Sequence, residues 1–291
     1  MANLKEVKQR ITSVVSTQQI TKAMKMVAAA KLRRAQDKIV QMRPYSQKLT
    51  NILNNVSAAA EGAEDLIYAQ KREVTKVLIV PITSDKGLCG AFNSNVIKAA
   101  NLAINEQFAG KQIFILPLGK KAYENFKKSD FALIDQFYQV FSDVAFDNVK
   151  SAAEFAMNGF VAGDYDQVVM VYNEFKNVAT QIIRTEQFLP MAKEDVTAEV
   201  STSETEYLLE PSRTYILEEL VPTALKIQFY KAVLDSNASE HGARMTAMDK
   251  ATENAGELLK ELRLMYNRTR QAAITNEILE IVAGANALGG K

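Results

Sequence analysis

The chain has very little cysteine and histidine, and each shortage excludes a class of protein. Cys89 is the only cysteine among 291 residues, so no disulfide can form within the chain, and a reducing compartment fits. His241 is the only histidine, so a zinc site built from Cys and His cannot be assembled. The opening residues MANLKEVKQR lack the apolar core of a signal peptide. No apolar run reaches the roughly 18 residues of a membrane span, so we expect no membrane insertion.

Proline and glycine are scarce towards the C-terminal end. No proline follows Pro222, and only Gly242 and Gly256 precede Gly284 in this stretch. Apolar and small residues recur there at alternating steps of four and three, which is a heptad pattern. Its positions are Leu234, Ala238, His241, Met245, Met248, Thr252, Ala255, Leu259, Leu262, Tyr266, Thr269 and Ala273. From Ile274 the stripe restarts one position over, so the last turns are predicted to face something new. The pattern predicts a helix over 211–288, too long for a compact globule at about 1.5 Å per residue.

A second heptad pattern fills residues 1–58. Its positions are Leu4, Val7, Ile11, Val14, Gln18, Thr21, Lys25, Ala28, Leu32, Ala35, Ile39, Met42, Ser46, Leu49, Leu53 and Val56. We expect the two terminal helices to pack on each other as an antiparallel coiled coil, because the residues between them return the chain through a domain at one end.

The middle of the N-terminal pattern is polar and contains a helix breaker. Its polar heptad positions are Gln18, Thr21 and Lys25. The apolar residues one position to the side are Ile20, Met24 and Val27. This offset predicts a rotated contact face. Pro44 predicts a kink or a break, because proline in a helix interior costs about 3 kcal/mol.

The central segment, 70–205, changes to the pattern of an α/β domain. Short apolar runs predict buried strands at Lys76–Thr83, Gln112–Leu118 and Gln167–Phe175, with an edge strand at Thr180–Leu189. Helical spacing occurs between them at Phe92–Phe108, Gly119–Lys128 and Asn148–Ala162. The alternation is typical of a mostly parallel sheet. The polar stretch Lys193–Thr205 is predicted to lead back to the C-terminal helix, which we start near Pro211.

Candidates for chemistry are few. The loop Ser84–Asn93 (SDKGLCGAFN) follows a strand and opens a helix, but its glycine spacing matches neither phosphate-binding motif. A tight turn is therefore favoured over an anion site. Cys89 could be a nucleophile only beside a base, and His241 falls on the heptad seam, so packing roles are favoured for both. We find no catalytic constellation and expect no cofactor.

Positive charge is concentrated at the N-terminal end. Residues 1–50 carry 11 Lys and Arg against only Glu6 and Asp37. Nucleic-acid binding would call for interleaved aromatic residues, and Tyr45 is the only aromatic residue in this stretch. A solvated charged face and attraction to an acidic protein surface remain open.

Four stretches together carry a family resemblance. They are ITKAMKMVAAAKLRRA from Ile20, SDKGLCGAFNSN from Ser84, ASEHGARMTAMDKATENAGELL from Ala238 and ITNEILEIVAGANA from Ile274. These segments resemble the gamma subunit of F-type ATP synthases. The resemblance runs from end to end and is least distinctive over 120–205.

The resemblance implies a rotating axle without bond chemistry of its own. The coiled coil would stand inside a ring of alpha and beta subunits, and a central Rossmann-like α/β domain would meet the epsilon subunit and the membrane c-subunit ring. Proton flow would thereby be coupled to ATP synthesis. By matching positions, the polar contacts with a catalytic-subunit loop would be Arg270, Gln271, Thr275 and Glu277. Met24 and Lys25 would face an acidic lever region of beta. The apolar tip in a collar of partner subunits would be Ile278, Ile281 and Ala285.

Absences refine this expectation. The regulatory cysteine pair of the plant chloroplast version is missing, so thiol switching is not expected. With Met1 intact and no transit peptide visible, we expect a bacterial protein held by partners on the cytoplasmic side of the plasma membrane. Two rival interpretations are an α/β nucleotide-binding enzyme with a pocket around Asp85–Asn93, and a coiled-coil scaffold or nucleic-acid binder.

Overall fold

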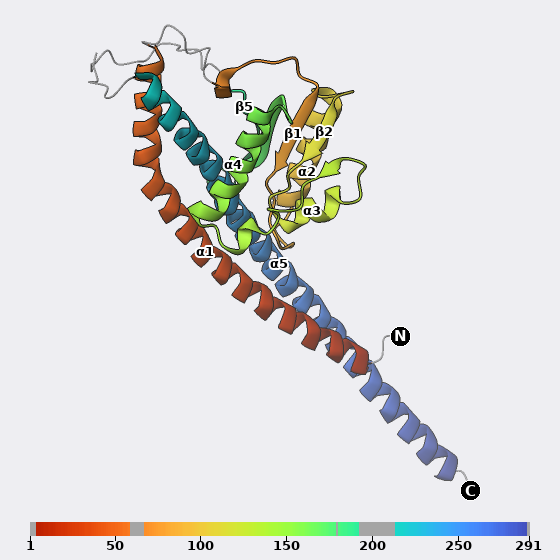
Figure 1. Ribbon diagram of the computed structural model, residues 1–291. Coiled ribbons are helices and arrows are strands. Elements are labelled where there is room, and N and C mark those ends of the chain that lie inside the picture. The colour runs from red at the N-terminus through yellow and green to blue at the C-terminus, as the bar shows by residue number, and fades with distance from the viewer. Residues whose placement is uncertain (1–3, 59–66, 179, 192–212, 290–291) are drawn as a thin grey trace. The chain divides into compact units, whose positions relative to one another are not determined.

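One long helix precedes the sheet-forming segment in the sequence, and a second long helix follows it. The computed structural model describes residues 4–58, 67–178, 180–191 and 213–289, and the predicted link Lys193–Thr205 lies outside them. Helix α1 spans Leu4–Ala58 and helix α5 spans Arg213–Gly289 (Figure 1). Of the kink or break predicted near Pro44, no break occurs, because α1 continues through this residue. Pro44 is exposed, so its ring meets solvent instead of a packed neighbour.

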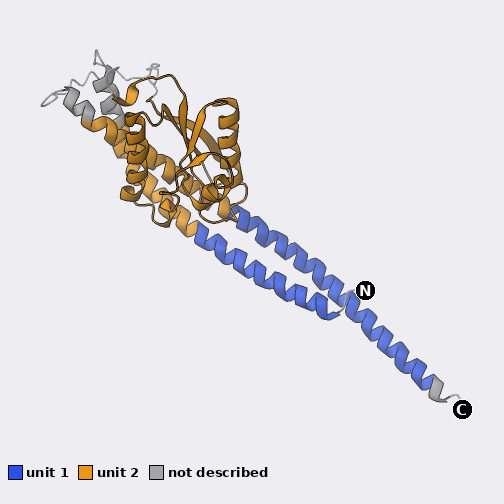
Figure 2. Ribbon diagram, turned by 45° about the vertical axis from the view of Figure 1, so that its right-hand side comes forward, with its two compact units in different colours: residues 1–28, 245–291 blue, residues 29–244 orange. Residues whose placement is uncertain are grey.

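The chain forms two compact units, and each long helix contributes to both. Unit 1 comprises residues 1–28 and 245–291, and unit 2 comprises residues 29–244 (Figure 2). The boundaries between the units therefore fall inside the two long helices, after residues 28 and 244, and not between the three predicted segments 1–58, 70–205 and 211–288.

Unit 2 contains a five-stranded sheet with strand order β3-β2-β1-β4-β5. The strands are β1 Lys76–Pro81, β2 Gln112–Ile115, β3 Ala132–Leu133, β4 Gln167–Phe175 and β5 Gln181–Leu189. β1 pairs in parallel with both β2 and β4, and β5 runs antiparallel to β4. The mostly parallel sheet and its predicted edge strand are confirmed. The two-residue strand β3 was not predicted, because so short a run has no readable period.

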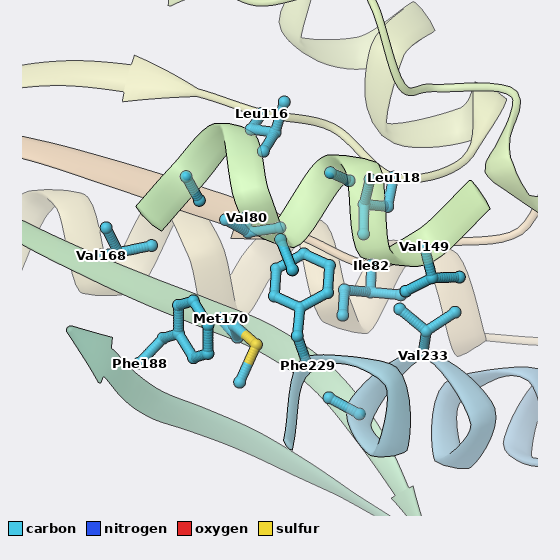
Figure 3. Close-up of a cluster of buried hydrophobic side chains, with 14 of the residues drawn as sticks. Val80, Ile82, Leu116, Leu118, Val149, Val168, Met170, Phe188, Phe229 and Val233 are labelled. Atoms are coloured by element: carbon cyan, nitrogen blue, oxygen red, sulfur yellow. The ribbon is translucent and has the colours of Figure 1, made fainter. Parts of the chain in front are cut away.

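Helices cover both faces of this sheet. They are α2 Phe92–Glu106, α3 Lys120–Phe126 and α4 Phe146–Ala162, with 3-10 turns η2 Ile67–Ala69 and η3 Val140–Ser142. On one face α4 and the unit 2 part of α5 pack over β1 and β4, where Phe229 of α5 lies beside Met170 and Val233 lies beside Val149 and Ile82 (Figure 3). On the other face α2 and α3 pack Val96 and Phe126 against the sheet. The result is a doubly wound, Rossmann-like α/β arrangement.

The strand order reverses between β1 and β4. The connections from β1 to β2 and from β2 to β3 use α2 and α3 on one face, whereas the return to β4 uses α4 on the other. In doubly wound sheets, ligands bind at such a point, beyond the carboxyl ends of the strands. The loop Ser84–Asn93 follows β1 at this edge.

Candidate partner-binding site and sheet-edge loop

In unit 1, α1 and α5 pack antiparallel along the predicted heptad seam. Thr21 Oγ1 lies 2.8 Å from Thr252 Oγ1, and Lys25 Nζ lies 2.5 Å from Asp249 Oδ1. The partner number falls along α5 as the number rises along α1, which defines the antiparallel direction. The buried apolar seam residues of this unit are Val7, Ala28, Met248, Ala255, Leu259 and Leu262.

The polar middle of the seam keeps the same register instead of rotating. Thr21 is only 9% exposed, whereas Ile20 and Val27 are each 57% exposed. The predicted rotated contact face is therefore wrong within this chain. The physical reason is that the polar groups in the seam have partners: the two threonine hydroxyls bond each other or carbonyls of their own helices, and Lys25 pairs with Asp249.

Among the described residues, no helix covers the last turns of α5. Every residue from 274 to 286 is exposed, and within unit 1 α5 continues past the N-terminal end of α1 (Figure 2). The large apolar residues among them, with their exposed fractions, are Ile274 48%, Ile278 54%, Leu279 60%, Ile281 71% and Val282 49%. At the spacing of an α-helix these residues share one broad face, and an exposed apolar face of this kind usually marks a protein contact. This segment is therefore a candidate contact surface for other subunits.

The residues predicted to contact a catalytic subunit lie on both helices of unit 1. Arg270, Gln271, Thr275 and Glu277 are all exposed on α5. Met24 and Lys25 are half-buried on α1, and Lys25 is already paired with Asp249. Sequence reasoning missed Asp249, although a position flanking a heptad seam is where an opposite charge should be sought. Contact of these side chains with a partner stays a prediction.

The loop Ser84–Asn93 in unit 2 is a tight turn whose polar groups bond within the protein. The Ser84 backbone N–H donates to Asn93 Oδ1 at 2.9 Å, and Asn93 Nδ2 donates to Cys89 Sγ at 3.2 Å. The guanidinium of Arg244, on α5, donates to the carbonyls of Lys86 and Gly87. Nothing in this geometry resembles an open phosphate cradle.

The two residues considered for nucleophilic chemistry are electrostatically unsuited to it. Burial raises the pKa of the Cys89 thiol, so the reactive thiolate is disfavoured. Burial, with nearby Lys31 and Arg244, lowers the pKa of His241 to about 4, so the imidazole is neutral at pH 7. Within the described part of the chain, no group of His, Cys, Asp or Glu could hold a metal ion. Among the described helices, none is both long and apolar enough to cross a bilayer.

These features define a class of protein: a subunit that carries a closed α/β domain on long helices and exposes an apolar helix end for other chains to enclose. The family model described as ATP synthase matches residues 3–288. The ATP synthase gamma chain of Cytophaga hutchinsonii is 55% identical over 293 residues, which cover 99% of each chain. That of Flavobacterium johnsoniae is 54% identical over 290 residues, which cover 100% of each.

Solved structures of ATP synthases also contain chains similar to this one. The central stalk and c-ring structure of Tetrahymena thermophila mitochondrial ATP synthase contains a chain with a TM-score of 0.55 and 26% identity, covering 80% of this chain and 99% of that one. A chain of the Euglena gracilis mitochondrial enzyme shares the fold, with a TM-score of 0.66 at 21% identity over 98% and 94% of the two chains. The chain belongs to the ATP synthase gamma chain family and is a rotor subunit of the central stalk of an F-type ATP synthase.

Proposed function

We propose that the chain is the non-catalytic axle that couples proton flow through a membrane ring to the cycling of catalytic beta subunits. The observation that carries this proposal is the exposed segment 274–286. Apolar burial contributes about 25 cal/mol per Å², so enclosing several large side chains in an apolar collar would stabilise the complex by several kcal/mol. Ile278, Ile281 and Ala285 would form the bearing surface in that collar, which the alpha and beta subunits would supply.

Polar residues beside the tip would make the contacts that distinguish one partner conformation from another. The proposed α5 contacts with a catalytic-subunit loop are Arg270, Gln271, Thr275 and Glu277. All four are exposed, so their charges and hydrogen-bonding groups are available to a partner. On α1, Met24 and Lys25 would face an acidic part of beta, and Lys25 would then be shared between that surface and Asp249. A charge contact made in only one conformation shifts the equilibrium towards it.

The α/β domain would serve as the foot of the axle, meeting the epsilon subunit and the membrane c-subunit ring. The closed Ser84–Asn93 loop, the raised Cys89 pKa and the lowered His241 pKa favour a mechanical role over catalysis. The bacterial relatives favour a place on the cytoplasmic side of a bacterial plasma membrane, where partner subunits would hold the chain.

The test is a charge placed in the proposed collar. Ile278→Glu should leave the free energy of unfolding of the isolated chain unchanged, because this side chain is already 54% exposed. In the complex the same carboxylate would be desolvated, so assembly or ATP-driven proton pumping should fall at least tenfold, equivalent to about 1.4 kcal/mol or more.

Glu280→Gln is the matched control, because it alters an exposed polar residue of the same segment. It should leave assembly and pumping close to wild type. The axle proposal is overturned if Ile278→Glu complexes assemble and pump normally, or if the purified chain alone hydrolyses ATP.

A further inference from the structure

Buried polar side chains of unit 2 gather where α5 crosses one edge of the sheet. The residues, none more than 9% exposed, are Thr83, Ser84, Asn173, Ser236, Ser239, Glu240 and Arg244. Thr83 and Ser84 follow β1, Asn173 lies near the end of β4, and the remaining four belong to α5. This edge contains the reversal point between β1 and β4, where sheets of this class bind ligands. Here a helix of the same chain occupies that place.

The serines of α5 bond directly to the backbone of the two strands that meet at the reversal point. Ser236 Oγ donates to the carbonyl oxygen of Ile82 at 3.3 Å, immediately after β1. Ser239 Oγ donates to the carbonyl oxygen of Asn173 in β4 at 3.1 Å. Ser236 and Ser239 are three residues apart and lie on the same face of α5, so this face contacts the backbone at the ends of both strands.

Arg244 extends the same contact to the loop after β1. Its Nη1 donates to the carbonyl of Gly87, and its Nη2 donates to the carbonyl of Lys86 at 3.2 Å and to Glu240 Oε1 at 2.6 Å. The Arg244 and Glu240 side chains are only 11% and 10% exposed. Burial raises the pKa of Glu240, and the hydrogen bond from Arg244 opposes that rise. Each charge therefore depends on the other, because an unpaired charge here would be desolvated without compensation.

We propose that Ser236, Ser239, Glu240 and Arg244 are positioning residues that clamp the α/β domain and its loop Ser84–Asn93 to α5, so that the domain and this part of the helix turn as one body. The mechanical part of this proposal rests on the proposed axle function. Apolar packing alone resists separation of the helix from the sheet, but it permits the helix to slide and rotate slightly on the sheet. Hydrogen bonds are directional, so bonds to fixed backbone carbonyls also set the rotation of the helix and its height on the sheet.

Cys89 provides a built-in reporter of the clamp. It is 1% exposed, it lies in the clamped loop, and it is the only cysteine of the chain. In the isolated chain, Arg244→Gln removes the charged fork that holds the loop carbonyls. We expect Cys89 to react with a thiol reagent at least tenfold faster than in the wild type under native conditions. Arg244→Lys, which keeps the charge that pairs with Glu240, should give an intermediate rate.

Lys226→Gln is the matched control on the same helix. It removes an ion pair of α5 with Glu154 of α4, 2.7 Å long, at a different contact. Cys89 reactivity should stay within twofold of wild type in this variant. If Arg244→Gln does not fold, Ser239→Ala serves instead, with a smaller expected acceleration. A folded Arg244 or Ser239 variant with wild-type Cys89 reactivity would overturn the clamp.

The mechanical part is tested in the assembled complex. Arg244→Gln should retain ATP hydrolysis but lower protons pumped per ATP at least twofold, whereas Lys226→Gln should match wild type. Faster Cys89 labelling with unchanged pumping per ATP would refute torque transmission by the clamp. Failure of the axle proposal itself would appear separately, as normal pumping by Ile278→Glu.

Discussion

The two units bury their apolar residues in different ways. In unit 2, Phe229 is 0% exposed and lies between a sheet and helices, with its ring centroid 5.4 Å from that of Phe188. In unit 1, only a narrow seam of residues is buried, among them Leu259 and Leu262, whereas Ile281 is 71% exposed. Unit 2 thus completes its core with its own residues. Unit 1 leaves part of its apolar surface exposed, which is what the proposed axle inside a ring would require.

The largest expected effect tests whether removing a buried side chain lowers the free energy of unfolding more in the core of unit 2 than in the seam of unit 1. Phe229→Ala should destabilise unit 2 by about 4 kcal/mol, because a rigid enclosed site keeps most of the cavity. Leu262→Ala should cost about 2 kcal/mol, the low end for a buried leucine, since a seam open to solvent can relax around the gap. Amide hydrogen exchange measured in increasing urea would give the free energy of opening for each unit.

Peptides from β1 and β4 report on unit 2, and peptides from residues 4–28 and 250–273 report on unit 1. Leu264→Ala is the control, because Leu264 is 61% exposed on the same helix as Leu262 and should change neither unit by more than about 0.5 kcal/mol. Equal costs for Phe229→Ala and Leu262→Ala would remove the proposed difference between the units.

The sequence predicted the parts of the fold that depend on a regular period. The heptad positions Leu259 and Leu262 are buried as expected, and the apolar runs at β1 and β4 form the centre of the sheet. The clamp was missed because Ser236 and Ser239 bond to carbonyls far away in the sequence, which no local pattern encodes. From Ala232 to Glu240, α5 is buried nearly all round, so a single stripe could not describe its contacts. The Ile278 tip is exposed as its place beyond the seam suggested, but its partner is absent from the chain.

The next effect concerns two titratable groups of unit 2 with opposite pH dependence, the buried Asp235 and the half-buried His241. Burial raises the pKa of Asp235 to about 6, with Glu174 and Glu186 adding to the rise and Lys231 and Arg43 opposing it. The folded state therefore binds a proton more tightly than the unfolded state, so this group favours folding below about pH 4 and loses that contribution as the pH rises to about 6. Asp235→Asn should raise the free energy of unfolding at pH 7.5 by up to about 3 kcal/mol and change it little at pH 4.

His241 acts with the opposite sign, because its folded pKa lies below the ordinary value of about 6.5. The neutral imidazole contributes its full stability above about pH 6.5 and loses it as the pH falls towards 4. His241→Gln should therefore flatten the acid side of the stability profile, whereas Asp235→Asn should steepen the net loss of stability on acidification. Urea denaturation of both variants between pH 4 and 8 checks the two signs, and parallel profiles for the variants and wild type would contradict both assignments.

The smallest effect concerns the polar layer of unit 1. Thr21 Oγ1 and Thr252 Oγ1 are 2.8 Å apart, yet each hydroxyl also lies within donating distance of a carbonyl of its own helix, Gln18 at 3.0 Å and Met248 at 2.7 Å. Each hydroxyl has one proton, so a bond across the seam replaces a bond within a helix and gains little. Thr21→Val and Thr252→Val should each cost about 1 kcal/mol or less, with a coupling energy near 0.5 kcal/mol in the double-mutant cycle.

Thr17→Val is the control, because its hydroxyl bonds the carbonyl of Ser13 on the exposed side of α1. Hydrogen exchange of residues 4–28 measures all four variants. A coupling above about 2 kcal/mol would mean that the polar layer, and not the apolar seam, holds the two helices of unit 1 together, and the contrast drawn with unit 2 would have to rest on hydrogen bonding instead of burial.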